Sequence, residues 1–341
     1  MTNTLSKALV ATAFLVVTSS AALAGATLDA IKQRDQVICG VNTGLGGFSI
    51  ADSTGRWVGL DVDICRAIAA ALLGDGNKVR FVPLNAQQRF TALQSGEVDV
   101  LSRNTTWTLT RDTQLGLNFT AVTYYDGQGF MVPKKLNVKS AKELAGATVC
   151  VQPGTTTELN LADYFRANNM QYKPVVIENL QEVNAAFFSG RCDTLTTDAS
   201  GLASVRVNDA PKGKSDDYVI LPEIISKEPL GPAVRQGDEQ WFDIVKWTVF
   251  ALVEAEELGI TQANVEELAK TSTNPNIKRV LGSTPGMGKA IGLPEDWVVK
   301  AVKAVGNYGE IFKRNVEPLG LPRGLNNLWN KGGIMYAPPI R

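Results

Sequence analysis

The sequence predicts an α/β protein of two lobes, each built on a mostly parallel, doubly wound sheet. Short apolar segments of strand character alternate with segments of helical periodicity along most of the chain, which is typical of successive βαβ units. The stretch 187–193 also echoes the stretch 93–99, because each joins a helix end, a glycine stop and a strand start. At 341 residues the chain exceeds what one core usually supports, so two lobes of about 100 to 200 residues are expected.

Residues 1–24 fit a cleaved secretory signal. Lys7 precedes an apolar run at 8–17, and small residues end the segment at Ala24. We therefore expect cleavage near Ala24, export, and a soluble mature chain, since no later stretch approaches the roughly 18 uninterrupted apolar residues of a membrane span.

The composition excludes several classes of function. The 34 basic residues balance the 34 acidic residues, which gives little support to a nucleic-acid or membrane-surface role. The sequence has no histidine, and this excludes Ser-His-Asp and Cys-His catalysis as well as His-ligated zinc. We expect neither a cofactor nor a metal site.

Four widely spaced cysteines in an exported chain indicate two disulfides, which three pairings could satisfy. We favour Cys39 with Cys65 and Cys150 with Cys192, because each pair then lies within one lobe. In the usual doubly wound order, the strand that starts at Cys192 also lies beside the strand that holds Cys150. Four buried free thiols remain an alternative.

The expected elements follow the chain in two similar rounds. The first round has a strand at 37–42, a glycine-rich turn at 43–47, a helix at 61–73, a strand at 78–83, a helix at 87–95 and a strand at 98–101. The second has a capped helix at 142–146, a strand at 148–152, a helix at 158–168, a strand from residue 192, a helix at 199–207 and a strand at 218–221.

The chain is expected to return to the first lobe near the proline and glycine residues at 229–232. A long amphipathic helix at 241–258, a helix at 295–314 and an extended tail at 318–341, wrapped on the first lobe, would follow. The expected division is a signal peptide at 1–24, lobe 1 at 25–132, lobe 2 at 133–228, and the return to lobe 1 with a C-terminal extension at 229–341.

The stretch 104–112, directly after the strand at 98–101, is the main candidate for a ligand site. It holds four hydroxyls, one amide and one guanidinium in nine residues. The planar guanidinium of Arg111 presents N–H donors that match the two oxygens of a carboxylate, and threonine hydroxyls can donate to the remaining lone pairs of that carboxylate. If both sheets present their carboxyl edges to one cleft, Asp198 of the second lobe faces this cation.

Both residues have an alternative reading. The stretch 104–112 would be an ordinary surface loop if its threonines cap a helix and Arg111 lies in solvent. Asp198 precedes the helix at 199–207, so it could serve only as the N-cap of that helix.

Four segments, 59–63, 93–99, 108–111 and 151–156, together resemble the periplasmic solute-binding proteins of polar amino-acid ABC transporters, family 3. The longer form, with the segments 319–326 and 333–339, is most similar to the broad-specificity, general L-amino-acid-binding members. The resemblance implies a type II periplasmic-binding-protein fold, with two lobes joined by two hinge strands and an L-amino acid held between them. It also implies a monomer in the periplasm that delivers its ligand to inner-membrane ABC permease subunits.

The resemblance assigns roles to particular residues. Arg111 would bind the α-carboxylate, helped by the hydroxyl of Thr106 and by backbone groups near Asn104 and Thr156, and Asp198 would bind the α-ammonium. Selectivity for the side chain would come from residues near Asn42, Arg89 and Trp107.

The sequence departs from relatives that select basic or polar ligands. Asn42 replaces an acidic residue, and Leu45 and Ala86 replace aromatic residues, which favours a permissive pocket. Two other functions remain as alternatives. One is an enzyme on the same scaffold, dehydratase-like and acting on a small carboxylate, with Glu158 and Asp198 as the nearby carboxylates. The other is a ligand sensor that docks on a receptor rather than on a permease.

Overall fold

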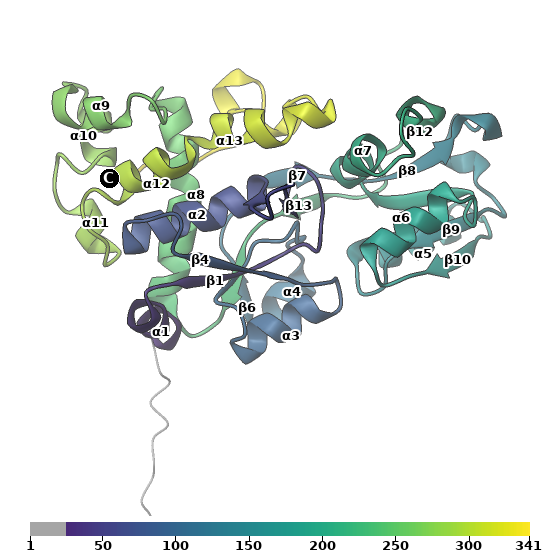
Figure 1. Ribbon diagram of the computed structural model, residues 1–341, viewed down its shortest axis with the longest axis horizontal. Coiled ribbons are helices and arrows are strands. Elements are labelled where there is room, and N and C mark those ends of the chain that lie inside the picture. The colour runs from purple at the N-terminus through teal and green to yellow at the C-terminus, as the bar shows by residue number, and fades with distance from the viewer. Residues whose placement is uncertain (1–24) are drawn as a thin grey trace, which may run out of the picture.

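The computed structural model describes residues 25–341, so the expected signal segment at 1–24 lies outside the described residues. Two lobes lie side by side, and each contains one five-stranded sheet with helices packed on it (Figure 1). This arrangement confirms the predicted two-lobed α/β fold. Within the described residues, no helix is both long enough and apolar enough to cross a membrane.

The first lobe has the strand order β4-β1-β5-β14-β6, and its strand β1 runs parallel to β4 and β5. Its strands are β1 (Val37–Val41), β4 (Val79–Pro83), β5 (Val100–Leu101), β6 (Leu117–Phe119) and β14 (Ala233–Arg235). The helices that follow the parallel strands are α2 (Leu60–Leu73), α3 (Gln88–Ser95) and α4 (Leu109–Gln114). A short helix α1 (Ala26–Arg34) precedes β1, and the hairpin of β2 (Ile50–Ala51) and β3 (Trp57–Val58) precedes α2.

The second lobe repeats this plan in the order β10-β9-β11-β8-β12. Its strands are β8 (Gln128–Pro133), β9 (Thr148–Val151), β10 (Lys173–Val176), β11 (Thr194–Asp198) and β12 (Tyr218–Ile220), and its helices are α5 (Thr156–Ala167), α6 (Leu180–Phe188) and α7 (Ala199–Asn208). The helix expected at 142–146 is only a short 3-10 turn at Ala141–Glu143.

Both sheets are mixed but mostly parallel, as expected, because a single strand in each sheet runs against the other four. In the first sheet β14 runs antiparallel to β5 and β6, and in the second sheet β8 runs antiparallel to β11 and β12. The physical reason is that β14 and β8 are the strands by which the chain arrives from the other lobe. Each enters its sheet from the hinge side, opposite in direction to the strands that belong to the βαβ units.

Two antiparallel strands, β7 (Tyr124–Asp126) and β13 (Glu228–Leu230), carry the chain between the lobes. All of β8 pairs within the second sheet, so the first crossing lies at β7, before the boundary that the sequence suggested at residue 132. We call the pair of β7 and β13 the hinge ribbon.

The internal repeat has a structural counterpart. Asp99 accepts the backbone N–H of Ile38 in β1 at 2.7 Å, and Asp193 accepts the backbone N–H of Thr148 in β9 at 2.7 Å. Each aspartate therefore fixes the first strand of its own sheet. Each follows a glycine with positive φ that ends the preceding helix.

The two predicted disulfides are confirmed: Cys39 bonds Cys65, and Cys150 bonds Cys192. Each bond lies within one lobe and joins a sheet strand to a neighbouring segment, and all four residues are buried. Neither bond crosses the hinge, so neither opposes a movement of one lobe relative to the other.

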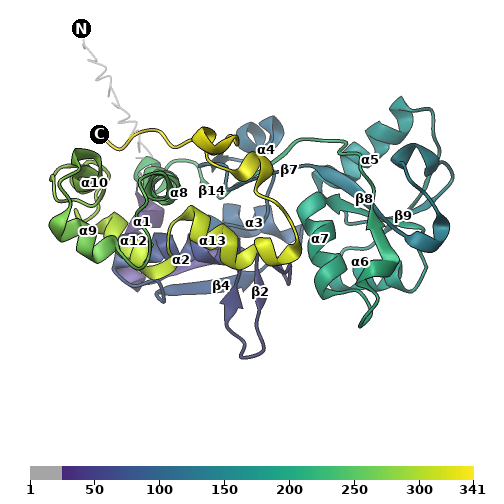
Figure 2. The same cartoon turned by 90° about the horizontal axis from the view of Figure 1, so that it is seen from above.

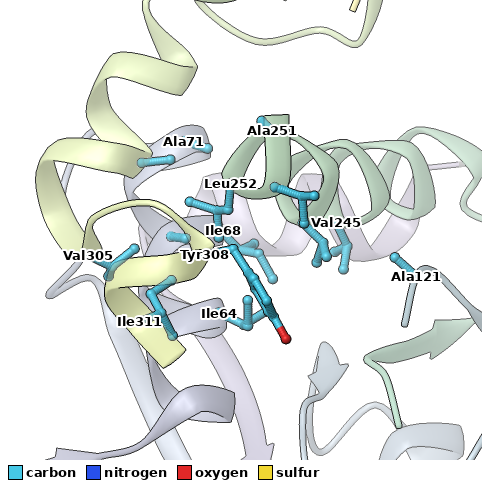
Figure 3. Close-up of a cluster of buried hydrophobic side chains, with 14 of the residues drawn as sticks. Ile64, Ile68, Ala71, Ala121, Val245, Ala251, Leu252, Val305, Tyr308 and Ile311 are labelled. Atoms are coloured by element: carbon cyan, nitrogen blue, oxygen red, sulfur yellow. The ribbon is translucent and has the colours of Figure 1, made fainter. Parts of the chain in front are cut away.

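The chain beyond β14 returns to the first lobe. Its helices are α8 (Glu239–Glu257), α9 (Val265–Thr271), α10 (Pro275–Val280), α11 (Met287–Ala290), α12 (Trp297–Val305) and α13 (Tyr308–Asn315). The single helix expected at 295–314 is wrong, because Gly306 adopts φ +82° and Asn307 starts α13 with a capping box. Figure 3 shows Tyr308 of α13 among Ile64 and Ile68 of α2 and Leu252 of α8, in one continuous apolar core.

Candidate functional site

Two helices begin at the junction of the lobes, α4 in the first lobe and α5 in the second. The hydroxyl of Thr108 caps α4 by accepting the backbone N–H of Arg111 at 3.3 Å. The hydroxyl of Thr155 caps α5 by accepting the backbone N–H of Glu158 at 3.1 Å. The helix-capping alternative is therefore correct for Thr108, but it does not account for the position of the Arg111 side chain.

Arg111 lies inside the protein, with only 8% of its surface exposed. Its Nη1 donates to the carbonyl oxygen of Thr106 at 3.0 Å, and its guanidinium lies 5.1 Å from the ring centre of Phe90. Burial lowers the pKa of Arg111, and the nearby carboxylates of Glu228 and Asp198 oppose that shift. The expected cation is thus buried next to anions from the hinge ribbon and from the second lobe.

Asp198 ends β11 and is buried, with 7% of its surface exposed. It occupies the N-cap position of α7, but its side chain makes no capping hydrogen bond. The N-cap alternative is therefore wrong for the carboxylate. Burial raises the pKa of Asp198 well above its usual value, with further contributions from Asp126 and Glu228, while Arg89 and a hydrogen bond from Asn104 oppose the rise.

Glu228 of β13 is a central residue of the site that the sequence reasoning missed. Its Oε2 accepts the hydroxyls of Thr106 at 2.6 Å and Thr156 at 2.9 Å, and its Oε1 accepts Asn160 Nδ2 at 2.8 Å and Ser226 Oγ at 2.6 Å. Thr106 belongs to the first lobe and Thr156 to the second, so this glutamate links the two lobes. The hydroxyl oxygens of Thr106 and Thr156 lie 3.3 Å from each other, and both hydroxyls donate to Glu228.

Asp126 of β7 was missed as well. Burial and the neighbouring Glu228 raise its pKa to about 6, while hydrogen bonds from Ser200 and from the backbone N–H of Gly127 favour its ionised form. One carboxylate thus stands in each strand of the hinge ribbon, and the two are paired in register. Glu228 stands directly before the return expected at 229–232, and this position was a signal that could have found it, whereas Asp126 lies before the expected boundary at residue 132 and had no such signal.

Arg89 of α3 is the least satisfied polar group of the site. Its residue surface is 3% exposed, and its Nε has no hydrogen-bond partner. Its Nη2 reaches the carbonyl oxygen of Gly154 in the other lobe at 3.4 Å, and its guanidinium stacks 4.7 Å from the ring centre of Phe90. A buried guanidinium with few partners strongly favours an arriving anion.

Asn42 and Asn104 lie together on the first lobe. Asn42 Nδ2 donates to Asn104 Oδ1 at 2.9 Å, and the backbone N–H of Asn104, which has φ +33°, donates to Asp61 Oδ2 at 2.8 Å. Both line a cavity between the lobes, together with Leu45 from the first lobe and residues of the second lobe that include Gln152, Asn184 and Thr197.

Trp107 lies differently from these residues. Its ring stacks on Phe119 with 5.7 Å between centroids, and 37% of its surface is exposed. It does not line the cavity between the lobes; neither do Arg89, Arg111 and Asp198, but these three are buried and Trp107 is not. Its packing is therefore mainly within the first lobe.

Within one polar junction, the site presents buried cations from the first lobe and buried carboxylates from the second lobe and the hinge ribbon. Such a junction suits a small zwitterion, whose desolvated charges need matched partners. Glu158, a carboxylate considered for enzyme chemistry, instead accepts the backbone N–H of Gly154 at 3.0 Å and closes the loop before α5. Within residues 25–341 there is no group of three or more His, Cys, Asp or Glu residues that could hold a metal ion.

Comparisons with known proteins agree with this geometry. The sequence model of one protein family, the bacterial extracellular solute-binding proteins, family 3, matches residues 37–263 of this chain. The general L-amino acid-binding periplasmic protein AapJ of Rhizobium johnstonii is 63% identical over 346 residues, covering 100% of both chains. The glutamate/glutamine/aspartate/asparagine-binding protein BztA of Rhodobacter capsulatus is 59% identical over 323 residues, covering 94% of this chain and 95% of BztA.

A solved structure is also similar over nearly the whole chain. It is an ABC transporter periplasmic binding protein from Brucella ovis with glutathione bound. The sequence identity is 59% and the TM-score is 0.89, and the match covers 92% of this chain and 99% of that chain.

Proposed function

Because this chain belongs to family 3 of the bacterial extracellular solute-binding proteins, we propose that it captures an L-amino acid between its lobes. It is a periplasmic binding protein of an amino-acid ABC transporter, and not an enzyme. Broad specificity is supported by the likeness to the general L-amino acid-binding protein AapJ and by the small or apolar side chains of Leu45 and Ala86.

The observation that carries the proposal is the burial of Arg111 and Asp198, which come from different lobes, near the same junction. A free amino acid has an α-carboxylate and an α-ammonium about 3 Å apart, and only matched counter-charges offset the cost of burying both. We assign the carboxylate to Arg111 and the ammonium to Asp198. A ligand that touches both lobes binds the closed form more tightly than the open form, so binding favours closure.

Isothermal titration of the mature protein, refolded to remove any carried-over ligand, tests this function. The panel contains L-amino acids, their D-enantiomers and analogues that lack the α-amino group. Binding of many L-amino acids and loss of binding for the des-amino analogues would support the assignment. Binding of a single ligand would overturn the broad specificity, and binding of none would overturn the function.

Arg89 is assigned to the side chain of the ligand, because its Nε has no partner within the protein. Replacing Arg89 by glutamine should weaken binding of L-glutamate by about 1.5 to 3 kcal/mol more than binding of L-glutamine, the usual strength of a hydrogen bond to a charged group. Titration of both ligands against both proteins measures this difference. Arg279→Gln is the control, because Arg279 is only partly buried and lies in α10 of the C-terminal part of the chain, and it should change neither affinity.

An equal loss for both ligands would contradict this role of Arg89. It would mean that Arg89 binds the α-carboxylate, which all amino acids share. The name of BztA lists both the acids and their amides as ligands, so it does not separate these outcomes, and the variant tests the role of Arg89 on this chain directly.

Glutathione is a second candidate ligand, because the similar structure from Brucella ovis has it bound. The γ-glutamyl end of glutathione carries a free α-carboxylate and a free α-ammonium, so the same charge pair could hold it. The glycine carboxylate at the other end would add an anion. A competition titration in which glutathione displaces L-glutamate would support a shared site.

We also propose that the protein acts as a monomer that delivers its ligand to inner-membrane ABC permease subunits, rather than to a receptor. The molar mass in solution, measured by light scattering, should match one chain with and without ligand. Stimulation of the ATPase activity of the reconstituted transporter by the liganded protein would support the permease as the partner. Its absence would leave the receptor alternative in place.

A further inference from the structure

The chain continues well past the part that matches the family model, which ends at residue 263. The helices of this C-terminal extension pack mainly on the first lobe, with α12 against α2 and α13 against α8. Its last part then runs from α13 toward the second lobe (Figure 2). There the 3-10 turn Glu317–Leu319 contacts α7, so the extension reaches the second lobe as well as the first.

One side chain of this extension binds the hinge ribbon directly. Asn326 Oδ1 accepts the backbone N–H of Tyr125 at 2.6 Å, and Asn326 Nδ2 donates to the carbonyl oxygen of Tyr125 at 3.0 Å. The side chain therefore takes the place of a neighbouring strand along the outer edge of β7. Asn326 is 4% exposed, so water does not compete freely for these two bonds.

Arg323 holds Asn326 in place. Its Nε donates to the carbonyl oxygen of Asn326 at 2.9 Å, and its two terminal nitrogens each donate to a carboxylate oxygen of Glu256 in α8 at 3.1 Å. The guanidinium also lies 5.2 Å from the ring centre of Tyr308, whose hydroxyl donates to the carbonyl oxygen of Thr123 at 2.8 Å. The support for Asn326 thus comes from the core of the first lobe.

The other edge of the hinge ribbon is held from the same lobe. The backbone N–H of Trp107 donates to the carbonyl oxygen of Pro229 at 2.8 Å, and the backbone N–H of Gly231 donates to the carbonyl oxygen of Thr105 at 3.1 Å. Tyr125 and Pro229 are opposite one another in register. With both edges bonded to the first lobe, the ribbon as far as Tyr125 and Pro229 has to move with that lobe.

From this geometry we infer that Asn326, positioned by Arg323, is a hinge clamp that sets where and how far the lobes open. Bending is confined to the next residues, Asp126 and Gly127 on one strand and Ser226 to Glu228 on the other. Fewer open conformations are then accessible, which raises the fraction of molecules competent to bind and so lowers the apparent Kd. The inference rests on the proposed function, since it concerns ligand capture by closure.

Small-angle X-ray scattering and titration of the full mature chain test the clamp. Ligand-free Asn326→Ala should have a larger radius of gyration than the wild type, and saturating ligand should remove the difference. Its Kd should rise by the same factor for every amino acid, roughly threefold to tenfold. Asn327→Ala is the matched control, because Asn327 Nδ2 bonds only within the tail, to the carbonyl oxygen of Lys331 at 3.0 Å.

Arg323→Lys is a second variant, which keeps a cation beside Glu256 but loses the fork that positions Asn326. Arg323→Lys should raise both the radius of gyration of the ligand-free protein and the Kd, each by less than Asn326→Ala does. If Asn326→Ala has the same radius of gyration and the same Kd as Asn327→Ala, the clamp is overturned, even if the melting temperature of Asn326→Ala falls. A loss that differs among amino acids would also overturn it, because it would indicate an effect on the pocket. A larger radius of gyration in a protein whose wild type binds no amino acid would support the clamp and refute the function.

Discussion

Replacing Arg111 by lysine is expected to weaken binding of every L-amino acid by about 2 to 5 kcal/mol. Lysine keeps the positive charge but loses the two-pronged donor that matches a carboxylate, and its shorter reach would also give up the bond from Arg111 Nη1 to Thr106. Because the side chain is buried, water would not replace the lost donors. Isothermal titration against the same panel of ligands measures the loss.

Arg235→Lys is the matched control for this prediction. Arg235 also binds backbone carbonyl oxygens within the first lobe, those of Leu93 at 2.8 Å and Val98 at 2.6 Å, but it lies away from the junction of the lobes. Its variant should lower the melting temperature without changing the Kd. An unchanged Kd in Arg111→Lys would mean that another group, with Arg89 as the main candidate, binds the α-carboxylate.

Features that local patterns determine could be predicted from the sequence. The two rounds of strand and helix, the glycine stops and the pairing of Cys150 with Cys192 follow from short-range periodicity and from the usual order of strands in such sheets. Arg111 and Asp198 could be singled out because Asp198 ends β11 and Arg111 lies in the polar stretch that follows β5. These features depend on neighbours in the chain or on one repeated unit.

Features that depend on contacts between distant segments could not be predicted. Glu228 enters the site only because β13 pairs with β7, about a hundred residues away, and its own sequence context, with Ser226 and Lys227 before it and Pro229 after it, looks like an ordinary polar loop. The direction of β8 and β14 depends on the route through the hinge ribbon. The hydrogen bonds between Asn326 and Tyr125 join residues 201 positions apart, so no local sequence pattern predicts them.

Replacing Asp198 by asparagine should cost about 3 to 5 kcal/mol of ligand affinity, as expected when one partner of a buried charge pair is removed. The side chain keeps its shape but offers the ammonium no charge. Analogues that lack the α-amino group offer Asp198 no ammonium, so the variant should change their affinity little. Asp193→Asn is a control in the same lobe, because Asp193 binds Thr148 and has no contact with the junction.

The pH dependence of binding tests the same assignment independently. In the ligand-free protein, burial raises the pKa of Asp198 and raises that of Asp126 to about 6. An arriving ammonium favours the ionised carboxylates, so below these pKa values binding must release protons. The affinity should therefore fall as the pH falls through the raised pKa values of these carboxylates, which is about 6 for Asp126, by up to tenfold per pH unit for each coupled proton. Asp198→Asn should reduce the slope of affinity against pH, and Asp126→Asn should remove only part of that slope.

The opposite pattern would contradict the assignment. If Asp198→Asn binds with the wild-type affinity and pH slope while Asp126→Asn loses both, the ammonium lies on the hinge ribbon and Asp198 is not its partner.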